Sequence, residues 1–285
     1  MKKKIISVIA GVAGLVVAYF VVSGISNVIY HHPEESATAE STMESAEQGT
    51  EEAKTAMTED EINEMLSGMK ATETAETVTE EQNEVIPVKF EELQAVNPDV
   101  YAWITVPGTD IDYPILQHAS DNSYYLMHNI DGSYGYPGCI YTENMNSKDF
   151  TDNNTVIYGH NMKNGSMFAQ LHKFEDPDFF DANREVLIYL PDEVLHYTIF
   201  AAHIYDDRHL LYSFDFADPD VYQKYLDSVF NIRDMSANID KDVTVTTDDQ
   251  IITLVTCIGS QPNNRLLVQA VLTDREAGTE AENAE

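Results

Sequence analysis

The feature that most constrains this chain is an apolar run near its N-terminus. Residues 5–30 contain no charged side chain and are rich in Ile, Val, Ala and Gly. A hydrocarbon core about 30 Å thick needs roughly 20 apolar residues in a helix, so the run is long enough to span a membrane. Three lysines in residues 1–4 precede it and an acidic segment follows, an order that predicts a cytoplasmic N-terminus.

We therefore expect an uncleaved signal anchor and a single-pass protein of the cell membrane. Residues 1–4 would be cytoplasmic, and the chain from residue 31 onward would be extracytoplasmic. The main alternative is a cleaved signal peptide. Its apolar core is usually only about 7–15 residues long and is followed by a small-residue cleavage site, which this sequence does not show.

The next segment, residues 31–84, is rich in Glu, Thr, Ala and Ser and poor in aromatic side chains. Such a composition buries too little apolar surface to offset the entropy of ordering, so we expect a disordered acidic stalk. Within it, Thr58 is a candidate N-cap for apolar residues at helical spacing, which predicts a short transient helix over residues 58–69. Residues 274–285 are also acidic, and we expect a disordered tail.

Residues 85–273 hold the only Trp and most of the aromatic residues, and we expect one folded domain here. Many short β-rich segments bounded by turn signals favour a mainly β fold, a closed barrel or a sandwich, over a parallel α/β sheet. Helices are predicted over residues 91–96 and 219–230, the second with Asp218 as N-cap and Pro219 in the first turn. The predicted strands are residues 101–106, 155–158, 186–190, 194–205, 243–246, 251–257 and 266–272.

Composition excludes several classes of function. The chain has 49 acidic against 16 basic residues and a formal net charge of −33, so it should repel nucleic acid. Its 2 cysteines exclude a Cys-rich zinc module and a multi-disulfide scaffold. Histidine spacing indicates no zinc motif, and we expect neither a metal nor a cofactor.

Three reactive side chains stand where predicted strands end or begin. Cys257 ends strand 251–257, His160 follows strand 155–158, and Arg265 precedes the strand after the cysteine. A cysteine nucleophile needs a nearby base or cation, and an arginine can stabilise an oxyanion. Each residue also has an ordinary structural explanation: a buried structural thiol, a hydrogen-bonded polar residue, or a surface salt bridge.

Taken together, these motifs resemble the sortases, membrane-anchored cysteine transpeptidases of Gram-positive bacteria. The sequence Thr-Leu-Val-Thr-Cys at 253–257, an earlier histidine and a following arginine form the family signature. Further blocks at 103–104, 108–117, 121–126 and 154–162 resemble class B in particular. The resemblance extends over residues 90–272.

The resemblance implies a closed eight-stranded β-barrel with an N-terminal helix and a long helix inserted between late strands. Cys257 would attack the threonine carbonyl of a C-terminal sorting signal on a secreted protein. An amine of a peptidoglycan precursor would then resolve the thioacyl-enzyme. His160 would act as general acid and base and Arg265 as oxyanion donor. The resemblance also implies that Asn122, Leu126 and Thr256 bind substrate.

Three other functions remain open from the sequence. A sortase that joins pilin subunits, a hydrolytic cysteine protease, and a membrane-tethered β-domain that only binds peptides or wall glycans fit the same residues. In the last case Cys257 would be structural. Val255 and Ile258 stand where some relatives carry a polar residue, so the preferred sorting motif does not transfer. Cys139 matches no catalytic position, and we expect it to be a packed strand residue.

Overall fold

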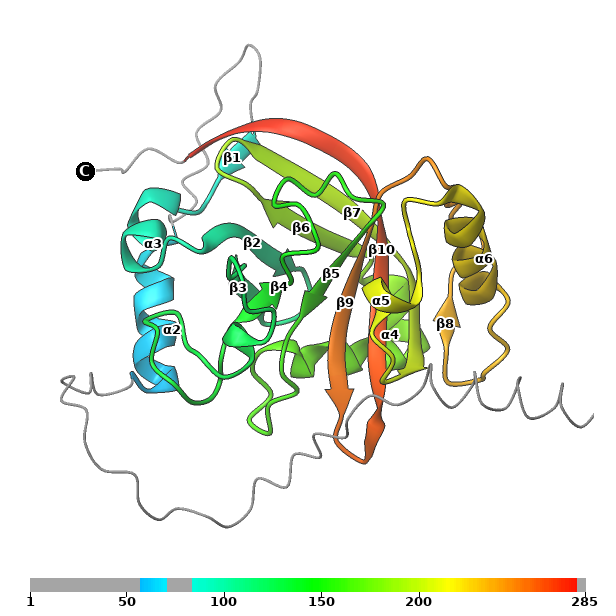
Figure 1. The fold of residues 1–285 in the computed structure, drawn as a ribbon, viewed down its shortest axis with the longest axis horizontal. Helices are drawn as coiled ribbons and strands as arrows, with labels where there is room; N and C mark the ends of the chain where they lie inside the picture. The colour runs from blue at the N-terminus through cyan, green and yellow to red at the C-terminus, as the bar shows by residue number, and fades with distance from the viewer. Residues whose placement is uncertain (1–56, 71–83, 281–285) are drawn as a thin grey trace, which may run out of the picture. The chain divides into compact units, whose positions relative to one another are not determined.

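The computed structural model describes residues 57–70 and 84–280, and eight of its strands close into a β-barrel (Figure 1). Around the barrel the order is β10-β9-β5-β4-β3-β2-β6-β7, and pairing of β7 with β10 closes it. Strands β1 and β8 extend the sheet from β10 and β7. The strands are β1 (Glu84–Ile86), β2 (Val100–Val106), β3 (Ile111–Leu116), β4 (Ile140–Thr142), β5 (Asn154–Tyr158), β6 (Glu185–Tyr189), β7 (Glu193–Asp206), β8 (Asn238–Ile239), β9 (Ile251–Ile258) and β10 (Gln261–Glu280). The expected closed eight-stranded barrel is confirmed.

Strand β9 lies between β5 and β10, and the predicted site lies at the ends of these three strands. It pairs with β5 in parallel and with β10 in antiparallel orientation. Every residue of β9 is buried except Cys257, which is exposed next to the strand's end. A strand buried on both faces reads as a continuous run of β-branched and apolar residues, which is how this segment could be predicted.

Helices cover the barrel and its ends. They are α2 (Glu59–Gly68), α3 (Phe90–Val96), α4 (Pro177–Ala182), α5 (Leu210–Ser213) and α6 (Pro219–Phe230), with 3-10 helices η1 (Tyr124–Leu126) and η2 (Phe168–Glu175). The predicted bounds of α6 are confirmed, and Asp218 caps it through the backbone N–H of Asp220. Its apolar face, including Tyr222 and Leu226, packs with Phe200 of β7 in a hydrophobic cluster separate from the barrel core.

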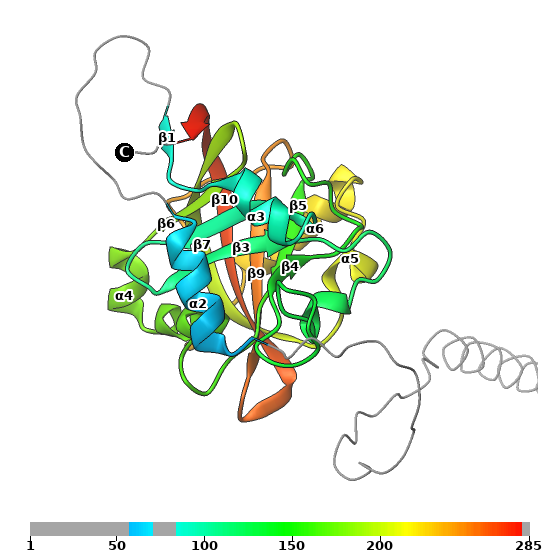
Figure 2. The ribbon, with the colours of Figure 1, turned by 90° about the vertical axis from the view of Figure 1, so that its left-hand side faces the viewer.

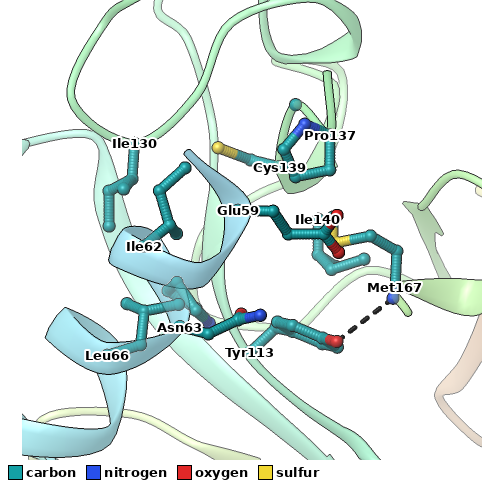
Figure 3. Close-up of a pocket in the computed structure, with 12 residues that line it drawn as sticks. Glu59, Ile62, Asn63, Leu66, Tyr113, Ile130, Pro137, Cys139, Ile140 and Met167 are labelled. Atoms are coloured by element: carbon teal, nitrogen blue, oxygen red, sulfur yellow. Dashed lines mark hydrogen bonds between the residues drawn. The ribbon is translucent and has the colours of Figure 1, made fainter. Parts of the chain in front are cut away.

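Helix α2 packs against the domain, although the sequence predicted only a transient helix in a disordered stalk (Figure 2). Thr58 and Glu61 form the predicted capping box. Ile62 and Leu66 are each 7% exposed and line an apolar pocket with Tyr113 (Figure 3). The segment is polar on average, so its composition did not predict a docked helix. Ile62 and Leu66 nevertheless lie one helical turn apart and face the barrel. Residues 31–56 and 71–83 lie outside the described residues.

Other differences concern the strands. The predicted strand 243–246 is wrong, because Asp249 accepts hydrogen bonds from the backbone N–H and the hydroxyl of Thr246 and so closes a turn. Strand β3 was missed because Pro114 interrupts its sequence pattern. Strand β10 continues to Glu280 in the predicted tail, where Arg275 pairs with Glu193 of β7 at 2.6 Å. Residues 281–285 lie outside the described residues.

One expectation about location is also corrected. Within residues 57–70 and 84–280, no helix has the length and apolar character needed to cross a membrane. This finding overturns the expected single-pass localisation in the cell membrane. The apolar run over residues 5–30, on which that expectation rested, lies outside the described residues.

Candidate active site

Strand register brings the three predicted catalytic residues to one end of the barrel. Tyr158 of β5 is the partner of Val255 in parallel β9, so His160 and Cys257 each stand two residues beyond a paired position. On the other side of β9, Cys257 is the direct antiparallel partner of Arg265. The cysteine therefore lies between the strand that delivers the histidine and the strand that delivers the arginine.

The backbone carbonyl of Cys257 accepts a hydrogen bond from Asn161 and lies beside the ring of His172. The amide Nδ2 of Asn161 donates to this oxygen at 2.8 Å, and His172 Nε2 lies 3.1 Å from it. His172 Nε2 is also 2.9 Å from Asn161 Nδ2, and its Nδ1 donates to Glu175 at 2.9 Å. With Nδ1 donating to Glu175, Nε2 of His172 can accept the second amide hydrogen of Asn161. The Cys257 side chain is exposed and its thiol is free.

His160 is half-buried and fixed by the segment that precedes β4. Its Nε2 lies 2.7 Å from the carbonyl oxygen of Leu126, and a carbonyl can only accept, so Nε2 carries a proton. The ring of Tyr136 packs edge-on against the imidazole at 5.2 Å between centroids. The remaining nitrogen, Nδ1, is the one available for proton exchange.

Arg265 is half-buried, and its guanidinium lies over the hairpin between β9 and β10. Nη1 donates to the carbonyl oxygens of Pro262 at 2.9 Å and Asn264 at 3.0 Å. These bonds occupy one nitrogen of a guanidinium that has five N–H donors. The group can therefore donate to a substrate oxygen beside Cys257 while it keeps its contacts with the hairpin.

A groove with a volume of about 440 Å³ contains all three residues. Tyr141 and Tyr158 lie along it with stacked rings whose centroids are 5.4 Å apart. Burial, followed by the charge of Glu143, raises the pKa of both phenols, so both are neutral at physiological pH. The end of β7, the turn that follows it and the start of α5 supply further lining residues: Asp206, Asp207, Arg208, His209 and Leu210.

The predicted substrate-binding residues differ in position. Leu126 lines the groove and is 40% exposed. Thr256 also lines it, but its buried hydroxyl donates to the carbonyl of Gly159 at 2.9 Å and so ties β9 to β5. Asn122 is not among the residues that line this groove, and its Oδ1 accepts from the backbone N–H of Asn144 at 2.9 Å.

Sequence reasoning missed the side chains that support the site. Asn161 directly follows His160, a position that could have drawn attention to it. His172 and Glu175 are three residues apart on η2, and no local pattern links them to Cys257. Cys139 is buried as expected, although it lies just before β4, and burial raises the pKa of its thiol.

The fold and site define a β-barrel protein that presents a free cysteine thiol at a strand end between a histidine and an arginine. The sortase domain model matches residues 104–273, more than half of the chain. The chain belongs to the sortase family, and it is a class B-like cysteine transpeptidase.

Individual relatives agree with this assignment. Sortase B of Listeria monocytogenes is 34% identical over 215 residues, which are 74% of this chain and 85% of the relative. A mutant form of Clostridium perfringens sortase B is similar in structure, with a TM-score of 0.60 and 32% identity over 65% of this chain and 87% of that one. A Streptococcus pyogenes class B sortase involved in pilus biogenesis is 28% identical, with a TM-score of 0.57 over 65% of this chain and 98% of that one.

Proposed function

We propose that this enzyme cleaves a C-terminal sorting signal after threonine and transfers the protein to an amine of a peptidoglycan precursor. The observation that carries the proposal is the register of β5, β9 and β10, which puts Cys257 between His160 and Arg265. A strand-end thiol in a groove, with an acid–base group on one side and a permanent cation on the other, suits acyl transfer.

The proposed reaction has two stages. The Cys257 thiolate attacks the threonine carbonyl, the peptide C–N bond breaks, and the leaving amine takes a proton from His160. The incoming amine then attacks the thioester, loses a proton to His160 and releases the thiolate. Because Nε2 of His160 is bonded to Leu126, the exchanged proton is carried on Nδ1. Arg265 donates to the carbonyl oxygen as it becomes an oxyanion in both stages.

The test uses the purified full chain and fluorogenic peptides of NPxTN-like and PPxTG-like sequence, with and without an amine acceptor. We expect cleavage that Cys257→Ala abolishes and an amine-linked product with the native chain. Arg265→Lys keeps the charge but loses the planar fork of donors, so we expect a kcat loss of about 10²-fold or more. Cleavage that persists in Cys257→Ala would refute the proposal, and a hydrolysed product alone would favour a protease.

A second candidate function is the joining of pilin subunits through lysine amines. It is favoured by the similarity to the Streptococcus pyogenes sortase involved in pilus biogenesis. The same assay separates the two functions when a lysine side chain in a folded protein and a short peptidoglycan-type amine compete as acceptors. Preferred capture by the protein lysine would support pilin joining.

A further inference from the structure

The groove contains a carboxylate–imidazole pair that the proposed reaction does not use. Glu143 directly follows β4 and is 9% exposed, and one of its oxygens accepts from His209 Nε2 at 2.8 Å. His209 is the N-cap residue of α5. Both residues line the same groove as Cys257.

The hydrogen bonds of His209 define which of its ring nitrogens carries the proton. The backbone N–H of Tyr212 donates to Nδ1 at 3.3 Å, so Nδ1 is unprotonated and the single ring proton is on Nε2. Glu143 therefore accepts the one ring proton of His209. Its Oε2 is buried and, among the described residues, receives no hydrogen bond of its own, although it lies 2.8 Å from the same Nε2. A buried carboxylate with one shared donor is a strong acceptor for an added cation.

Other groups along the groove favour a positive ligand. Asp206 is paired with Arg208 at 2.7 Å, so those two charges compensate each other. The stacked rings of Tyr141 and Tyr158 lie between the pair and the nucleophile, and an aromatic face attracts a cation. Tyr158 reaches the pair directly, with its hydroxyl 3.5 Å from His209 Nε2.

Strand geometry gives the distance from this pair to the nucleophile. Thr142 pairs with Ile157, and Ile157 pairs with Leu254. Glu143 lies one residue beyond this row, and Cys257 lies three residues beyond it in the opposite direction. The two residues are therefore about four residues apart along the strands and two strand spacings apart across them. At about 3.3 Å per residue and 4.8 Å per spacing, their backbones are roughly 16 Å apart.

An extended peptide covers about 3.3–3.6 Å per residue, so 16 Å corresponds to four or five residues. The length of the two side chains that meet at the pair shortens this by about one residue. A substrate side chain at Glu143 would therefore stand three or four residues from the threonine whose carbonyl is at Cys257.

We propose that Glu143 and His209 form a subsite for a basic side chain, lysine or arginine, three or four residues upstream of the threonine in the sorting signal. This inference rests on the proposed function, since it assumes that the groove holds a sorting peptide. In this proposal, the pair determines whether the enzyme prefers a charged or a neutral residue at one position of the substrate.

The experiment measures kcat/KM of the full chain on peptides in which one lysine is moved through the positions on both sides of the threonine. Norleucine replaces the lysine in a matched neutral series. We expect lysine to raise kcat/KM about tenfold over norleucine at one upstream position, as for one charge-assisted hydrogen bond. Glu143→Gln should remove this advantage and change cleavage of the neutral peptide by less than about twofold. Asp242→Asn, an exposed acid outside the groove, is the matched control and should keep the advantage.

Three results would overturn the inference: no position that prefers lysine, a preference only downstream of the threonine, or an equal loss on both peptides in Glu143→Gln. The lysine scan on the native chain decides the question even if Glu143→Gln folds poorly. Failure of the proposed function would look different, because the native chain would then show no Cys257-dependent cleavage of the neutral peptides either.

Discussion

Replacement of Leu66 by alanine tests whether α2 is a docked element of the domain. Leu66 and Ile62 are the two buried side chains of this helix. Burial of two such side chains contributes about 1.5–3 kcal/mol each, or about 3–6 kcal/mol in total. Ordering a backbone costs about 1–2 kcal/mol per residue, and the ten residues of α2 recover only part of this through helical hydrogen bonds. The net free energy that keeps α2 docked on the domain is therefore small.

Leu66→Ala should cost about 2–5 kcal/mol, which is comparable to the whole apolar contribution to docking. We expect α2 to detach while the barrel stays folded, because the barrel core does not include the α2 side chains. Glu59 of α2 accepts hydrogen bonds from Asn164 and Ser166 in the loop after His160. Detachment should therefore also lower turnover.

Hydrogen exchange by mass spectrometry measures this directly. In Leu66→Ala, amides of residues 62–68 should exchange at least about 10-fold faster than in the native chain, whereas amides of β9 and β10 should keep their protection. Glu64→Ala removes an exposed side chain of the same helix and is the control. Unchanged protection of α2, or an equal loss of protection throughout the barrel, would refute the reasoning.

Three further outcomes are expected. Iodoacetamide should label Cys257 in the folded protein and Cys139 only after denaturation, because Cys139 is buried and its thiol pKa is raised; peptide mass mapping shows which thiol reacts. Asn161→Ala should lower kcat about tenfold and leave KM within about twofold, since it removes hydrogen bonds of roughly 1–2 kcal/mol that fix the Cys257 carbonyl; steady-state kinetics would show the split. Burial lowers the pKa of His203, so below about pH 6.5 the unfolded chain binds a proton that the folded chain excludes. The free energy of unfolding should therefore fall as pH drops below this value, and urea titrations of native chain and His203→Gln should show a weaker fall in the variant.

The barrel and the strand that carries Cys257 could be predicted because local signals agreed with the final structure. Helix α6 begins at a proline after a capping aspartate, and its apolar residues recur at helical spacing. Strand β9 is a run of β-branched and apolar residues that ends near a cysteine. Each signal lies within a single segment of the sequence, so these predictions needed no knowledge of contacts with distant residues.

The parts that could not be predicted depend on partners far away in the sequence. Strand β10 extends past Leu272 because a register shift lets Asp274 pair with His196 of β7. The contacts of His172 and Asn161 with the Cys257 carbonyl join residues 85 and 96 positions apart. Composition alone also failed for α2, where the folded state depends on a surface that another segment provides.

A continuous set of contacts joins α2 to Cys257. Glu59 holds Asn164 and Ser166, the loop that contains them begins with Asn161, and Asn161 donates to the carbonyl of Cys257. The same loop is closed at its base, where Phe168 donates to the carbonyl of His160. Because both His160 and Cys257 contact this loop, any force or ligand that displaces α2 acts on both of these proposed catalytic residues together. If His160 and Cys257 have the proposed roles, α2 supports both of them, and we expect an active fragment of this enzyme to begin before Thr58.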